Sequence, residues 1–113
     1  MNADRYYAML RDCQNIDLIP VQHDRESCYH LFVVHVDQRD PVRDVLADQG
    51  ISTGLHYPVP IHLQNAYSHL GYGKGTFPNS EHRATRMISL PMYAELKEQE
   101  IDYVSTALRQ ACI

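Results

Sequence analysis

A run of β-branched and aromatic side chains extends over Cys28-Tyr29-His30-Leu31-Phe32-Val33-Val34-His35-Val36. The length and composition of this run predict a β-strand, because such side chains pack well on a pleated, half-buried surface. Both faces of the run are largely apolar, which predicts a central strand that is covered on both sides. We therefore expect these nine residues to form the centre of the fold.

A helix is expected soon after this strand. Asp40-Pro41 has the pattern of an N-cap followed by proline at the first helical position. Residues 42–46 carry an apolar stripe at helical spacing, and Gly50 is expected to end the helix in a left-handed conformation. The chain should then return as an extended segment over Ile51 to Tyr57. Residues 28–57 are thus predicted to form a strand–helix–strand unit.

The remaining segments add further helices and one short strand. Helices are expected over Ala3 to Arg11, from Leu63 to Leu70, from Phe77-Pro78 to about Met87 and over about Glu98 to Ala111; a strand is expected at Ile88-Ser89-Leu90, and Asn15 to Glu26 should be mostly loop. The sum predicts the α/β class, as an α+β two-layer sandwich in which helices pack on a small sheet of three or more strands. The 113 residues are expected to form a single domain.

Charge and cysteine content limit the classes of partner and compartment. The chain has 10 basic and 14 acidic side chains and a net charge of −4, with no basic stripe, which argues against a nucleic-acid partner. No apolar run reaches the roughly 20 residues of a membrane span, and the chain does not open with a signal peptide. Cys13, Cys28 and Cys112 are far apart in the sequence, which fits free thiols in a reducing compartment. A cytoplasmic protein without a membrane partner is expected.

Several common kinds of catalytic site are not indicated. His56, His62 and His69 are six and seven residues apart, whereas a helical metal pair needs a spacing of four, so no metal site is expected. No serine or cysteine lies in a nucleophile motif, so no catalytic residue is assigned. The three glycines of Gly71 to Gly75 do not have the spacing of a phosphate loop and favour a plain surface turn.

The tract from Gly50 to Gln64 carries more polar chemistry than a plain connector needs. It holds two glycines, two prolines, two histidines and a tyrosine. The prolines stiffen the turn, and strand ends that feed loops are common ligand sites in α/β proteins. The candidate ligand-binding residues are Thr53, Gly54, His56, Tyr57 and His62. The alternative is that His56 and Tyr57 only hydrogen-bond the turn.

Many pieces of the chain match one family pattern in order and spacing. These pieces are His30-Leu31-Phe32-Val33-Val34, Arg39-Asp40, Gly50 to Gly54, His56 to Gln64, Ala66-Tyr67, Leu70-Gly71-Tyr72, Phe77-Pro78 and Ser89-Leu90-Pro91. On them the chain resembles the C-terminal domain of the DegT/DnrJ/EryC1/StrS family. Members of that family are pyridoxal-phosphate-dependent aminotransferases that act mostly on nucleotide-linked keto-sugars.

The resemblance implies the small domain of a fold type I aminotransferase. In such enzymes a separate large domain holds pyridoxal phosphate on a lysine, and the amino group usually comes from glutamate. Lys74 and Lys97 are the two lysines here, and neither lies in a segment that resembles the family's lysine motif. We therefore expect the large cofactor domain to be absent from residues 1–113, and no cofactor to bind this chain alone. The parent is expected to be a homodimeric aminotransferase, and the isolated chain to be inactive.

The resemblance also implies a place for the polar tract. The five candidate residues, and the His56-Tyr57-Pro58 segment above all, are expected to face the substrate cleft, without any of them acting as the proton-transfer base. Two alternatives stay open. In the first alternative, the chain is a stand-alone sugar-nucleotide-binding module that kept the fold. In the second, it is an interaction domain that pairs with a separate large-domain chain in trans.

Overall fold

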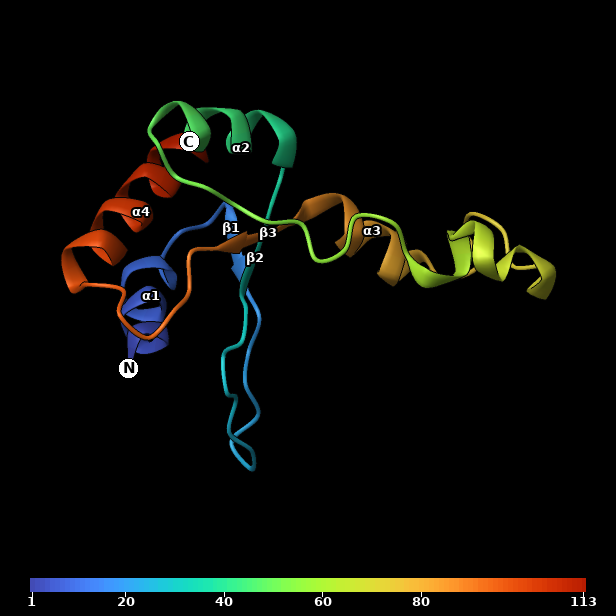
Figure 1. Ribbon diagram of the computed structural model, residues 1–113, viewed down its shortest axis with the longest axis horizontal. Coiled ribbons are helices and arrows are strands. Elements are labelled where there is room, and N and C mark those ends of the chain that lie inside the picture. Colours follow the sequence, from blue (N-terminus) through green and yellow to red (C-terminus); the bar gives the residue numbers. More distant parts are fainter.

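The centre of the molecule is a three-stranded antiparallel sheet. The computed structural model describes residues 1–113. Its strands are β1 (Ile16–Leu18), β2 (Phe32–Val36) and β3 (Met87–Leu90), in the order β1-β2-β3 (Figure 1). Val34 of β2 is paired with Leu18 on one side and with Ile88 on the other. The prediction of a central strand is therefore confirmed.

The limits of the strands differ from the prediction in two places. Cys28 to Leu31 lie outside the strand, and Tyr29 has a φ of +47°, a left-handed conformation that interrupts extended backbone. The Tyr29 ring stacks on Phe32, so the aromatic character of this segment serves packing. The prediction of a strand from Cys28 is thus wrong for its first four residues. Strand β1 lies in a segment for which the sequence predicts mostly loop, because three residues are too few to show an alternating pattern.

The helices lie close to their predicted places. They are α1 (Asn2–Leu10), α2 (Arg39–Asp48), α3 (Pro78–Arg86) and α4 (Glu98–Ala111), with short 3₁₀ turns η1 (Ile61–Leu63) and η2 (Asn65–Leu70). Helix α2 begins earlier than predicted, so Asp40 lies in its first turn and Gln38 is the N-cap. Pro41 is tolerated there because the first helical N–H groups have no partner in the helix. Gly50, with a φ of +75°, follows the end of α2 as predicted.

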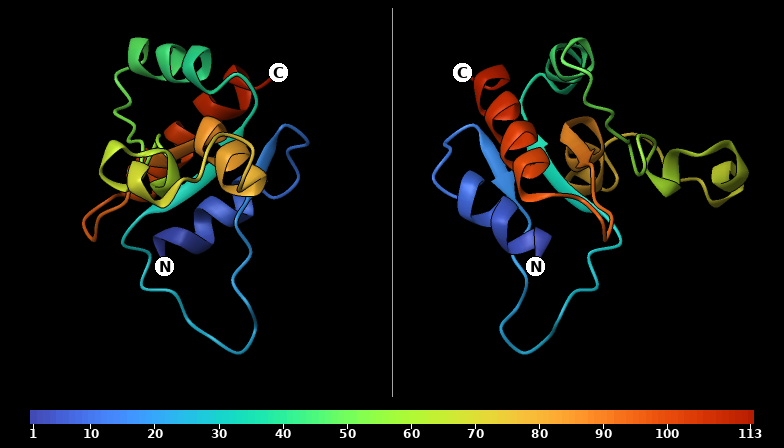
Figure 2. Two further views of the ribbon diagram at one scale, coloured as in Figure 1. Left: turned by 90° about the vertical axis from the view of Figure 1, so that its right-hand side faces the viewer. Right: turned by 60° about the vertical axis from the view of Figure 1, so that its left-hand side comes forward.

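One apolar core joins the sheet and the helices. Helix α1 packs on α4, and α4 packs on α2, so that α1 and α4 lie side by side along the sheet (Figure 2). Tyr6 and Leu10 of α1 and Ile101 and Leu108 of α4 are fully buried in this core. The predicted α+β class, a small sheet with helices packed on it, is confirmed. None of the helices combines the length and the apolar composition that crossing a bilayer requires.

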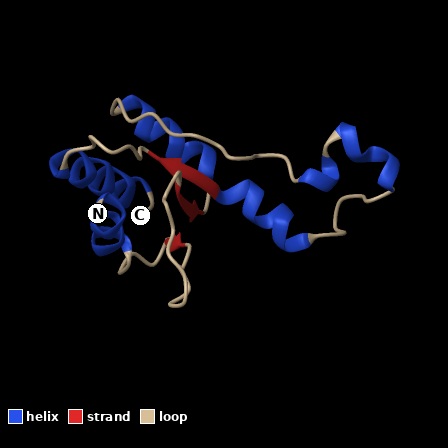
Figure 3. Cartoon of the chain, turned by 60° about the horizontal axis from the view of Figure 1, so that its bottom comes forward, coloured by secondary structure: helices blue, strands red, loops and turns tan.

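A long excursion leaves this body between α2 and α3. We call residues 55–77 the arm; it includes η1 and η2 and points away from the sheet (Figures 1 and 3). It accounts for the elongated shape, with extents of 48 × 36 × 26 Å. The helix predicted from Leu63 to Leu70 is present here as the 3₁₀ turn η2, while Leu63 is the last residue of η1.

The segment that leads into the arm is extended but is not a full strand. Within Ile51 to Tyr57, Gly54 alone pairs with the sheet, through an isolated antiparallel bridge to Ser89 of β3. The two N–H···O distances of this bridge are 3.0 and 2.9 Å. The prediction of a strand–helix–strand unit is therefore wrong in its last element, which touches the sheet at one residue.

Candidate functional site

Four of the five predicted site residues lie where the chain leaves the sheet for the arm. We call Thr53 to Tyr57 the root of the arm. Thr53 and Gly54 are half-buried, whereas His56 and Tyr57 are exposed, Tyr57 to 70%. Because the bridge to β3 fixes Gly54, the side chains on either side of it start from a defined backbone position. The root therefore exposes the rings of His56 and Tyr57 next to a backbone position that the sheet fixes.

The His56 imidazole is held by contacts on two sides. Its Nδ1 lies 2.9 Å from the Oγ of Ser89, a buried residue of β3. Its ring also lies over Gly54, where an added Cβ would overlap the imidazole. A side chain at position 54 would therefore push the His56 ring out of this place. The Tyr57 ring packs against His56 edge to face, with ring centroids 5.5 Å apart, and the peptide bond between the two residues is cis.

A cation from α2 reaches the root at Thr53. The Nε of Arg43 donates to Thr53 Oγ1 at 3.2 Å. Arg43 and Ser89 were not among the predicted site residues. Arg43 lies on a helix face with no motif to mark it, and Ser89 lies in a buried strand. Their part in the root depends on how α2 and β3 pack.

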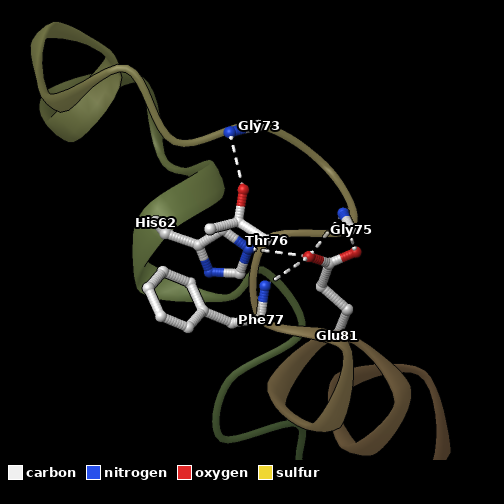
Figure 4. Close-up of polar contacts among 6 residues, drawn as sticks. All are labelled: His62, Gly73, Gly75, Thr76, Phe77 and Glu81. Atoms are coloured by element: carbon white, nitrogen blue, oxygen red, sulfur yellow. Dashed lines mark hydrogen bonds and ion pairs between the residues drawn. The ribbon is translucent and has the colours of Figure 1, made fainter.

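His62 is placed differently from the other four candidates. It is buried in η1, and its Nε2 lies 2.9 Å from Glu81 Oε1 of α3 (Figure 4). The His62 ring packs edge to face on Phe77, with centroids 4.9 Å apart. No hydrogen bond or ring contact joins His62 to the root. The structure thus groups Thr53, Gly54, His56 and Tyr57 together, and ties His62 to the arm's return segment.

Glu81 organises that return segment. Its carboxylate accepts the Gly75 N–H at 2.8 and 2.9 Å and the Phe77 N–H at 3.4 Å, in addition to the contact with His62 (Figure 4). These donors, the Gly75 N–H first and His62 next, hold the pKa of Glu81 below its usual value. Because a protein carboxylate already occupies the Gly75 N–H, the geometry fits the predicted surface turn better than a phosphate loop.

The root does not form a nucleophile–base set or a metal site. The Ser89 hydroxyl is only 4% exposed and already bonded to His56. No carboxylate hydrogen-bonds the His56 ring, so the orienting group that such a set requires is missing. No three His, Cys, Asp or Glu side chains lie close enough together to hold a metal ion.

The lysines do not fit a site for pyridoxal phosphate. Lys74 lies in the exposed glycine-rich turn at the far part of the arm, and Lys97 precedes α4 on the surface. Neither lines one of the five main depressions of the surface, whose linings are all made by other residues.

The surface of the arm is unusually apolar. Its exposed large apolar side chains are Tyr57, Val59, Ile61, Tyr67, Leu70, Tyr72 and Phe77. Beside Tyr57 and Leu63 the surface is hollowed by an open depression of about 570 Å³. Several exposed apolar side chains within one segment are typical of a site that meets another molecule or domain.

The chain is similar to known proteins in both sequence and structure. The model of the DegT/DnrJ/EryC1/StrS aminotransferase family matches residues 1–109. The chain is 36% identical over 107 residues to the erythromycin biosynthesis sensory transduction protein EryC1 of Saccharopolyspora erythraea, which covers 95% of this chain. It is 34% identical to the dTDP-3-amino-3,4,6-trideoxy-alpha-D-glucose transaminase of Streptomyces venezuelae, with 96% of this chain covered. Among solved structures, S. venezuelae DesV in complex with a ketimine intermediate superposes with a TM-score of 0.92, at 34% identity over 96% of this chain.

The match covers a minor part of each of these proteins. The chain spans 29% of the length of EryC1, 28% of the S. venezuelae transaminase and 29% of the DesV chain. Nearly the whole of this chain therefore corresponds to less than a third of each relative.

Proposed function

The chain belongs to the DegT/DnrJ/EryC1/StrS aminotransferase family, and we propose on this premise that it forms the C-terminal small domain of an enzyme that aminates a nucleotide-linked keto-sugar. The relative from S. venezuelae is named as a transaminase of a dTDP-linked sugar, which supports this substrate class. The single observation that carries the proposal is the root of the arm. It displays His56 and Tyr57 at the surface, next to an apolar arm that lacks a partner.

The partner of this surface is the large domain of the same enzyme. That domain contributes the lysine and the pyridoxal phosphate. The large domain is joined to the small domain either within one polypeptide or in trans, and glutamate is the proposed amino donor of a homodimeric enzyme. The exposed side chains of the arm, such as Ile61 at 69%, support a large apolar contact. On this proposal the isolated chain does not transaminate.

The residues of the root have separate roles in the proposal. His56 and Tyr57 face the substrate, where an imidazole N–H and a phenol can hydrogen-bond sugar or phosphate oxygens. Gly54 gives room for the His56 ring, and Thr53 presents its hydroxyl beside Arg43. His62 remains a predicted substrate-binding residue, but its contact with Glu81 supports a role in positioning the arm.

The proposal is tested by titrating the isolated chain with dTDP- and UDP-linked sugars while histidine ring signals are followed by NMR. Because the isolated chain lacks the large domain that completes the proposed substrate cleft, the sugars should cause no saturable change in the His56 signals. The matched control is the complete enzyme, in which the same ligands should shift these signals with saturation. Saturable binding by the isolated chain would contradict the proposal and would favour a stand-alone sugar-nucleotide-binding module.

A further inference from the structure

Two cysteines that are 99 positions apart in the sequence lie at one hollow. Cys13 follows the end of α1, and Cys112 is the last residue before the C-terminal Ile113. Both line an open depression of about 530 Å³ between the α1–β1 connection and the last turn of α4. Both are half-buried and pack against the apolar core. Cys28, in contrast, is exposed in the β1–β2 connection.

Hydrogen bonds hold the two chain segments together on both sides of the thiols. The Asn15 side chain donates to the carbonyl oxygen of Cys112 at 2.7 Å. One turn earlier in each helix, Arg109 Nη1 donates to the carbonyl oxygen of Met9 at 3.3 Å. Cys13 lies between Met9 and Asn15, and Cys112 lies just beyond Arg109. The backbone positions of both cysteines are therefore fixed relative to each other by contacts that do not involve sulfur.

The thiols also influence each other. Burial, and next the neighbouring Cys13 thiol, raise the pKa of Cys112 to about 11. The Cys112 thiol is therefore mostly protonated at neutral pH and is a poor first nucleophile. Cys112 is therefore suited to act second, as the thiol that resolves the product formed on its partner.

From this arrangement we propose that Cys13 and Cys112 are a redox-modification site, which forms an intramolecular disulfide on exchange with a low-molecular-weight disulfide. In the first step the Cys13 thiolate attacks one sulfur of the small disulfide, and one small thiol leaves. In the second step the Cys112 thiolate attacks the Cys13 sulfur, and the second small thiol leaves. The two cysteine hydrogens end on the two released thiols, so the protein pair is oxidised and the small disulfide is reduced.

The new bond would join the end of α1 to the end of α4. These helices already pack on each other in the core, so the bond would add a covalent link around nearly the whole chain. Cross-links that close long loops restrict the unfolded chain most. The oxidised protein should therefore be more stable than the reduced protein, with a melting temperature higher by roughly 10 °C.

The test uses the Cys28→Ser variant, which removes the exposed thiol and leaves the pair. This variant is incubated with oxidised glutathione, and its intact mass, its free thiols under denaturing conditions and its melting temperature are measured. We expect both thiols to disappear without retained glutathione, and the melting temperature to rise. Matched variants that also carry Cys13→Ser or Cys112→Ser should keep one glutathione each and show no such rise.

Peptide mapping without reductant decides the connectivity. A linked pair of peptides that contain Cys13 and Cys112 from a single chain would support the proposal. Retention of glutathione on the Cys28→Ser variant, two thiols that stay free, or links that join separate chains would overturn it. The melting curves also show whether each variant is folded, so a failure to fold is not read as a failure to cross-link.

Discussion

At the scale of single residues, Glu81 joins the return segment of the arm to η1. One carboxylate accepts hydrogen bonds from two backbone N–H groups and faces the buried His62. Such charge-assisted hydrogen bonds are stronger than neutral ones. The position of η1, which carries His62, therefore depends on a side chain 19 residues further along the chain.

This contact predicts a pH dependence with a defined sign. The folded protein holds the pKa of Glu81 below its usual 4.5, so the stabilisation is complete above about pH 4.5 and is lost as the pH falls through the folded value. Hydrogen exchange of the Gly75 amide, measured for the wild type and for Glu81→Gln, should differ most above about pH 4.5. The difference should shrink at lower pH.

Glu95→Gln is the matched control, because Glu95 is exposed and makes no hydrogen bond or ion pair. Its Gly75 amide should exchange at the rate of the wild type. Equal Gly75 exchange in the wild type and in Glu81→Gln at neutral pH would contradict the assigned role of Glu81.

A second prediction concerns the glycine of the root. In Gly54→Ala the new methyl group would overlap the His56 imidazole, which must then leave Ser89 Oγ. The ring nitrogen shifts of His56 should therefore change in ¹⁵N NMR spectra of Gly54→Ala. Gly73→Ala, where the added carbon meets no atom within 4 Å, should leave them unchanged. Unaltered His56 shifts in Gly54→Ala would show that the close approach is not real.

The composition of the root could be predicted from the sequence, but its neighbours could not. Glycine, histidine and tyrosine in one short tract indicate a ligand site by residue type alone. Arg43 and Ser89 join the root only through packing of α2 and β3, and Glu81 meets His62 only because the arm folds back on itself. One sequence contains no signal for such contacts between distant positions.

At the scale of elements, α4 carries one unsatisfied group. The hydroxyl of Ser105 is fully buried and has no hydrogen-bond partner. The buried hydroxyl has given up its hydrogen bonds to water without gaining others, so its removal should stabilise the folded state. Alanine also has a higher helix propensity than serine. Ser105→Ala should therefore raise the free energy of unfolding by about 1 kcal/mol in urea titrations.

The matched control lies on the next residue of the same helix. Thr106 is exposed, so Thr106→Ala should give only the propensity gain of a few tenths of a kcal/mol. A loss of stability in Ser105→Ala would mean that the hydroxyl has a partner in the folded protein.

Helices were easier to predict than strands in this chain, for a physical reason. The apolar stripe of α4 and the proline that begins α3 act within one helix, so their positions were predicted closely. Strand β1 has three residues and exists because β2 pairs with it. The extended segment before the arm likewise depends on β3, which pairs with it only at Gly54.

At the scale of the whole molecule, the arm is the feature that a single domain does not explain. It extends well away from the core that α1, α4 and the sheet form (Figure 3). Its exposed aromatic and aliphatic side chains would be an aggregation risk in an isolated protein. On the proposed function the large domain covers these side chains, and the substrate lies at the root between the two domains.

The most direct test of this account is steady-state kinetics of the complete enzyme that carries this domain, with His56→Ala and Tyr57→Phe. Each change should raise the KM for the nucleotide-linked keto-sugar roughly tenfold, the effect of one lost hydrogen bond of about 1.4 kcal/mol. The Kd for pyridoxal phosphate should stay the same, and Tyr103→Phe on α4, outside the root, should change neither constant. Weaker cofactor binding with an unchanged KM for the sugar would contradict the placement of the root at the substrate.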